Sequence, residues 1–115
     1  MVTKGLPPRG DVLALLFEHT ETPGLRKHAL AVEIAMRAYA KRLGEDPELW
    51  GATGLIHDFD YEKHPTPEEH PFVGCAILRD RGFPEPMIQA ILSHASYSGT
   101  PRETPLAKAL FACDE

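Results

Sequence analysis

The chain has 115 residues, a net charge of −5 and a pI near 5.6, so it is the size of one domain and lacks the broad basic surface that DNA or RNA needs. Its 43% hydrophobic and 25% charged residues are typical of a globular protein, and no apolar run reaches the length of a membrane span. The two cysteines, Cys75 and Cys113, form neither a CxxC pair nor a disulfide framework, which favours a reducing cytoplasm.

Proline pairs mark four predicted helix starts along the chain. The Thr or Asp oxygen can cap a free backbone N–H, and proline suits the first helical position. The pairs are Thr22-Pro23, Asp46-Pro47, Thr66-Pro67 and Thr104-Pro105. Glu69 lies three residues after Thr66, which completes the pattern of a capping box.

The spacing of apolar residues predicts six helices and no strand. In chain order the helices cover about residues 11–18, 23–43, 47–58, 67–81, 85–96 and 105–115. Gly44 and Gly82 close two of them. The last helix is still running at Glu115, so we expect the natural polypeptide to continue. The pattern predicts an all-α fold, with residues 1–115 forming a single helical bundle.

Polar side chains interrupt the apolar faces of five predicted helices. They are His28, His57, Asp58, His70, His94 and Asp114. A single histidine on an apolar face is often a core residue bonded to a carbonyl, but a buried carboxylate is rare because its desolvation is costly. Four inward histidines and two inward carboxylates, with few basic partners, favour a shared metal ion. Their donor atoms suit Zn, Fe, Mn, Ni or Co, whereas His19 and His64 are expected at the surface.

An ordered set of four side chains resembles the H…HD…D pattern of the HD superfamily: His28, His57, Asp58 and Asp114. The segments EEHPFVGCAIL, AILSHAS and LAKALFACDE are similar to the corresponding stretches of HDIG-type proteins. The resemblance covers the chain from about residue 25 to residue 115. The chain departs from HD-GYP phosphodiesterases, because His94-Ala95 replaces their His-His pair and no GYP tripeptide follows. It also carries HDFD where many HD enzymes carry HDIG.

The resemblance implies a helical bundle with one or two metal ions and, most often, hydrolysis of the phosphate esters of nucleotides. It assigns metal ligation to the four side chains of the H…HD…D pattern. His70 and His94 match the extra histidines of members with two ions, in which Asp58 would bridge. Alternatively, these two histidines contact the substrate phosphate or a bound water.

Several further residues are candidates for catalysis or substrate binding. A divalent ion lowers the pKa of bound water and polarises a phosphoryl oxygen. Asp58 is predicted to be catalytic as well as a ligand. Asp60 and Glu62 are candidates for orienting or deprotonating water, and the alternative is that they are solvated loop acids. Lys27 and Arg102 are candidates for holding a phosphate, and the alternative is that they are surface charges.

The leading hypothesis is a cytoplasmic, metal-dependent phosphohydrolase that acts on a small nucleotide or phosphate ester, not on a nucleic-acid polymer or at a membrane. The bound metal supplies the positive charge that the acidic chain lacks. One alternative is a mixed-valent di-iron oxygenase, because some HD-like proteins use the ligand order H…HD…H…H…D for oxygen chemistry. Another is a non-catalytic HD module that senses a ligand. The substrate, the metal and the oligomeric state stay open.

Overall fold

The computed structural model describes residues 5–114, and within that range it contains six α-helices, one short 3-10 helix and no strand. The elements are α1 (Arg9–His19), α2 (Pro23–Leu43), α3 (Pro47–Ile56), α4 (Phe72–Asp80), α5 (Glu85–His94), η1 (Ser96–Ser98) and α6 (Pro105–Cys113). The predicted all-α bundle is confirmed. The final residue of the last predicted helix, Glu115, lies outside the described residues. In the described part of the chain, no helix combines the length and apolar character needed to cross a bilayer.

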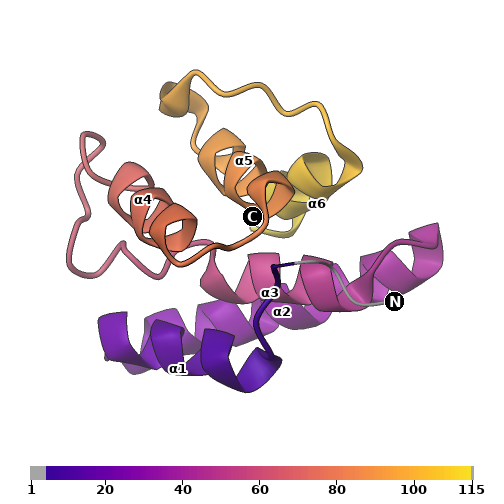
Figure 1. The fold of residues 1–115 in the computed structure, drawn as a ribbon, viewed down its shortest axis with the longest axis horizontal. Helices are drawn as coiled ribbons and strands as arrows, with labels where there is room; N and C mark the ends of the chain where they lie inside the picture. Colours follow the sequence, from indigo (N-terminus) through magenta and orange to yellow (C-terminus); the bar gives the residue numbers. More distant parts are fainter. Residues whose placement is uncertain (1–4, 115) are drawn as a thin grey trace.

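Helix α3 is the centre of the fold (Figure 1). Helices α1 and α2 pack against it from one side, while α5 and α6 contact it from the other. Every residue from Trp50 to Ile56 is therefore buried, as a helix surrounded by protein requires. This packing holds the C-terminal end of α3, and the residues that follow it, in the interior of the molecule.

Three of the four predicted helix starts are confirmed. Helices α2, α3 and α6 begin at the proline of their pair. The side chains of Asp46 and Thr104 accept hydrogen bonds from backbone N–H groups of the first turn, at 3.0 and 3.1 Å. Thr22 makes no such cap, because its hydroxyl is hydrogen-bonded to the carboxylate of Glu62 instead.

The predicted helix start at Pro67 is wrong. Helix α4 begins five residues later, after a series of turns and a cis peptide bond between His70 and Pro71. Pro71 has no N–H to complete a helical turn, and a proline disfavours helical conformation in the residue before it. The capping box does not form either, because the Glu69 side chain pairs with His64. His70 therefore lies in a turn rather than on a helix.

The helix ends place the candidate ligands. Gly44 and Gly82 follow α2 and α4 with positive φ angles of 72° and 79°, as predicted. Helices α3, α5 and α6 end about two residues earlier than expected. Each of these three ends lies at or directly before a candidate ligand, namely His57-Asp58, His94 and Asp114.

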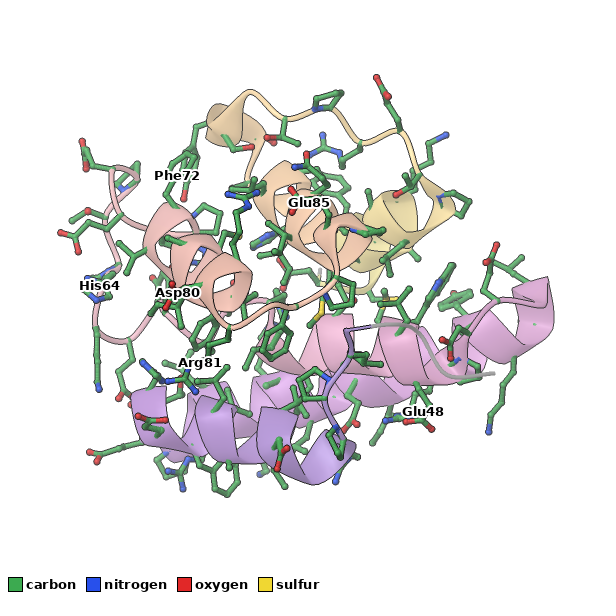
Figure 2. The ribbon with its side chains drawn as sticks, viewed as in Figure 1. Glu48, His64, Phe72, Asp80, Arg81 and Glu85 are labelled. Carbon is green, nitrogen blue, oxygen red and sulfur yellow. The ribbon has the colours of Figure 1, made fainter. Side chains whose placement is uncertain are left out.

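A network of charged side chains joins the first three helices. Glu33 of α2 is 3% exposed, and it accepts hydrogen bonds from Arg9 at 2.7 and 2.9 Å and from Arg37 at 3.1 Å. Arg37 also donates to Glu48, at 3.1 Å, on the outer face of the molecule (Figure 2). Its side chain crosses α3 over Gly51, where a Cβ atom would lie 2.5 Å from the Arg37 Nε atom.

Candidate metal centre

Six side chains that could hold metal converge in two groups that share Asp58. The first group is His28, His57, Asp58 and Asp114, and the second is Asp58, His70 and His94. Within each group, one potential ligand atom per residue lies within 4.8 Å of all the others. The structure thus brings together all six residues that the sequence singled out, from α2, α5, the ends of α3 and α6, and the α3–α4 loop (residues 57–71).

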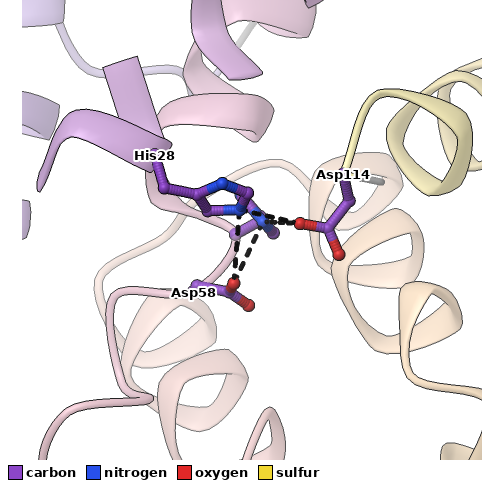
Figure 3. Close-up of side chains that lie close together, drawn as sticks. His28, Asp58 and Asp114 are labelled. Atoms are coloured by element: carbon purple, nitrogen blue, oxygen red, sulfur yellow. Dashed lines mark hydrogen bonds and ion pairs between the residues drawn. The ribbon is translucent and has the colours of Figure 1, made fainter. Parts of the chain in front are cut away.

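The first group is built around the Asp114 carboxylate (Figure 3). Its Oδ1 atom lies 2.9 Å from His28 Nε2 and 2.8 Å from His57 Nε2. The Oδ2 atom of Asp58 lies 3.2 Å from His57 Nε2 and 3.9 Å from His28 Nε2. Two imidazole nitrogens and two carboxylate oxygens therefore face one another.

The second group uses the other oxygen of Asp58. Its Oδ1 atom lies 3.3 Å from His70 Nε2 and 3.2 Å from His94 Nε2. The Asp58 carboxylate thus directs one oxygen to each group. This is the arrangement that a carboxylate needs if it is to bridge two cations.

The histidine rings are held so that Nε2 faces the centre. In His57 and His94, the Nδ1 atom is hydrogen-bonded to the backbone carbonyl three residues earlier, at 2.7 Å for His57. In His70, Nδ1 lies 2.6 Å from Oδ1 of Asp60. A neutral histidine that donates from Nδ1 keeps its lone pair on Nε2, which is the atom left to bind a metal.

The centre is open on one side. Three of its histidine side chains are exposed by 9% or less and form its floor: His57, His70 and His94. The other three side chains are partly exposed, namely His28 by 39%, Asp58 by 23% and Asp114 by 28%. The Asp58 carboxylate, which both groups share, is therefore partly accessible to solvent.

The histidines and carboxylates of the centre shift one another's pKa values. Burial lowers the pKa of His57, but hydrogen bonds to Asp114 and Asp58 outweigh burial and raise this pKa to about 10. At His70, hydrogen bonds to Asp58 and Asp60 likewise outweigh burial and raise the pKa to about 9. Burial raises the pKa of Asp58, but hydrogen bonds from three histidines hold it well below its usual range. The pocket thus stabilises positive charge next to its carboxylates.

The donor set fits one or two divalent transition-metal ions. Donors about 2.1 Å from a tetrahedral ion lie roughly 3.4 Å apart, and the nitrogen–oxygen distances in the two groups run from 2.8 to 3.9 Å. The donors are imidazole nitrogens and carboxylate oxygens, which suit Zn, Fe, Mn, Ni and Co. The ends of α3, α5 and α6 also lie here, and a helix C-terminus carries partial negative charge that favours a cation.

The other predicted site residues lie outside this set of donors. Asp60 is 2% exposed, and both of its oxygens are hydrogen-bonded within the protein. Glu62 accepts hydrogen bonds from the segment before α2. Lys27 is exposed, while the guanidinium of Arg102 lies 3.9 Å from the centre of the Phe111 ring. Roles for these residues in catalysis or in phosphate binding stay predictions.

The two remaining histidines are both partly exposed. His64 pairs with Glu69 on the outer side of the α3–α4 loop (Figure 2). His19 is half-buried, and its ring lies edge-on to Phe59 at 5.2 Å between centroids. The expectation of a surface position is therefore confirmed only in part for both histidines.

Two contacts that support His70, one direct and one through Asp60, were not predicted from the sequence. The Tyr97 hydroxyl donates to the His70 carbonyl at 2.5 Å, and the backbone N–H of Gly74 donates to Asp60 at 2.9 Å. The sequence does carry a sign of the second contact, since a glycine within an apolar helical stripe often has a packing role. It carries none for Tyr97, whose contact depends on the tertiary fold.

The family model described as HD domain matches residues 25–115, a range that includes all six donors. No curated protein and no solved structure shows a significant match.

Proposed function

Because the chain belongs to the HD domain family, a superfamily of metal-dependent phosphohydrolases, we propose that it hydrolyses a small nucleotide or another phosphate ester. The observation that supports this most is the position of Asp58. Its two oxygens face two separate groups of donors, and its side chain is 23% exposed on the open side of the centre. A phosphate can therefore approach the residue that both groups share.

The residues of the centre have distinct tasks in this proposal. A bound divalent ion would lower the pKa of a water molecule and polarise a phosphoryl oxygen. Asp58 and Asp114 are negatively charged and would repel a phosphate unless cations held by the pocket offset that charge. The buried histidines present Nε2 from fixed rings, which keeps the donors in place without reorganisation. His28 and Asp114 border the opening through which the substrate enters.

The rest of the molecule favours a small substrate. The net charge of −5 gives no basic surface along which a nucleic-acid polymer could lie. Cys75 and Cys113 are both free thiols, which is consistent with the reducing cytoplasm that we propose as the site of action.

A mixed-valent di-iron oxygenase is the second candidate. The observation that favours it is the complete order of six donors, because some HD-like proteins use this order for oxygen chemistry. Iron-dependent oxygen consumption, with no phosphate release from any substrate, would support this candidate over hydrolysis. A purely ligand-sensing module is less well supported, since such a module does not need buried carboxylates aimed at a common centre.

The proposed function is tested with the Asp58→Ala variant. Wild-type protein is offered nucleotides and sugar phosphates with Mn, Co, Ni, Mg or Zn, and phosphate release is measured. We expect release by the wild type, no release by Asp58→Ala, and severalfold less bound metal in that variant. Asp80→Asn is the matched control, because Asp80 is an exposed acid at the end of α4 (Figure 2). Full metal content and activity in Asp58→Ala would contradict the proposal.

A further inference from the structure

The buried carboxylate of Asp60 is the starting point. Asp60 lies two residues after Asp58 and is 2% exposed. A charged group at such a position is stable only when it is paired and hydrogen-bonded. Its Oδ1 atom lies 2.6 Å from His70 Nδ1, and its Oδ2 atom accepts the backbone N–H of Gly74 at 2.9 Å. Both oxygens are thus engaged on the side of the His70 ring that faces away from the metal centre.

Gly74 makes this position of Asp60 available. It is the third residue of α4, and an N–H group in the first turn of a helix has no partner within the helix. A Cβ atom at residue 74 would lie 2.9 Å from Asp60 Cγ and Oδ2, and 2.9 Å from the Phe59 ring. Only glycine therefore lets the carboxylate approach the backbone of α4 this closely.

The orientation of the His70 ring depends on a side chain, that of Asp60. His57 and His94 are held by backbone carbonyls of their own helices, whereas His70 lies in a turn and its Nδ1 is held by a side chain. A carboxylate that accepts Nδ1–H fixes the tautomer with a free lone pair on Nε2, which here lies 3.3 Å from Asp58 Oδ1.

We propose that Asp60 is the positioning residue of the second donor group: it holds the His70 ring with Nε2 toward Asp58. This inference rests on the two-ion centre of the proposed function and departs from the earlier expectation that Asp60 acts on water. Asp60 does not itself touch the metal or the substrate. It acts through His70, and Gly74 keeps it in place.

The Asp60→Asn variant tests this role with almost no change in shape. An amide can satisfy only one of the two donors, because one of its ends is itself a donor. If the amide oxygen turns to Gly74, its NH₂ group faces His70 Nδ1 and favours the tautomer with the proton on Nε2. We expect zinc loading to fall from about two ions per chain to about one, since loss of such a partner weakens metal binding about 10–100-fold.

The metal count is measured by elemental analysis of the full chain after equilibration with excess Zn²⁺ and dialysis. Histidine ¹⁵N NMR of the zinc-loaded protein reports the tautomer of His70, which a merely structural role of Asp60 would leave unchanged. The double variant Asp60→Asn with His70→Ala should bind as much zinc as His70→Ala alone, because both changes disable the same ligand. Glu69→Gln is the control, since Glu69 is an acid of the same loop that pairs with His64, and it should retain both ions.

Gly74→Ala provides a second route if Asp60→Asn does not fold. It displaces the carboxylate without changing a polar side chain, so the second ion should again be lost. Two ions and an unchanged His70 tautomer in Asp60→Asn would overturn the proposal, as would a single ion in the wild type. The metal count does not depend on hydrolysis. A lack of phosphate release by protein that holds two ions would therefore overturn the proposed function and leave the role of Asp60 intact.

Discussion

We predict that His57 and His70 carry protons in the metal-free protein and lose them when a cation binds. Their pKa values are about 10 and about 9, so both rings are charged at pH 7, and a metal ligand must be neutral. We predict that metal binding at pH 7 releases about two protons per chain from these rings. The release should decline toward zero above about pH 10. Calorimetric titrations with Zn²⁺ in buffers of different ionisation enthalpy measure this number, and metal binding without proton release would contradict the assignment.

The raised pKa values of the same two histidines predict how the stability of the metal-free protein depends on pH. A pKa that is raised on folding adds stability below the unfolded value, here 6.5, and this stability is lost as the pH rises through the folded value. With chelator present, the melting temperature should therefore fall between pH 6.5 and about pH 10. Metal-loaded protein is the control, because its neutral ligands should make this decline smaller. A melting temperature that rises across this interval without metal would contradict the prediction.

At the scale of elements, Gly51 leaves room for the Arg37 side chain of α2 to lie across α3. A Cβ atom at residue 51 would lie 2.5 Å from Nε and 2.7 Å from Cγ of Arg37, so the base of that side chain would have to move. We predict that Gly51→Ala lowers the free energy of unfolding by roughly 1–3 kcal/mol, as measured by urea denaturation. Gly24→Ala is the control. Residue 24 is an exposed helical position with nothing within 4 Å of an added Cβ, so this change should stabilise by about 0.5–1 kcal/mol. Equal effects of the two changes would contradict this account of α2 and α3.

Most helices could be predicted because their signals are local. Proline pairs at Pro23, Pro47 and Pro105 coincide with observed helix starts, and apolar spacing depends only on neighbours along the chain. The start of α4 was predicted wrongly because two local signals conflict. The pattern from Thr66 to Glu69 favours a cap, but Pro71 prevents the helix from continuing.

The candidate ligands could be selected because each interrupts an apolar stripe predicted from the sequence, although the structure places His70 in a turn and Asp58 and Asp114 just after helix ends. The division of these ligands into two groups could not be predicted from the sequence, because it depends on which Asp58 oxygen faces which histidine. The role proposed here for Asp60 was equally out of reach. Its contacts with His70 and Gly74 form between a loop and a helix start that the sequence pattern does not place side by side.

At the scale of the whole molecule, the centre joins elements that are distant in the sequence. His28 and Asp114 are separated by 86 positions. His28 lies on α2, and Asp114 directly follows α6. A ligand that binds only the folded state at 1,000 times its dissociation constant adds about 4 kcal/mol, or roughly 15 °C in melting temperature for a domain of this size. We predict a shift of this order when metal is added and its reversal by chelator. A melting temperature that is insensitive to metal would contradict a centre built from these helices.

The number of ions held by the wild type and by the double variant His70→Ala with His94→Ala tests the two-group centre most directly. The Nε2 atoms of both histidines lie beside Oδ1 of Asp58, whereas the first group keeps all four of its donors in the variant. Elemental analysis of protein equilibrated with excess metal should therefore give about two ions per chain for the wild type and about one for the variant. One ion in both proteins would contradict a two-ion centre bridged by Asp58.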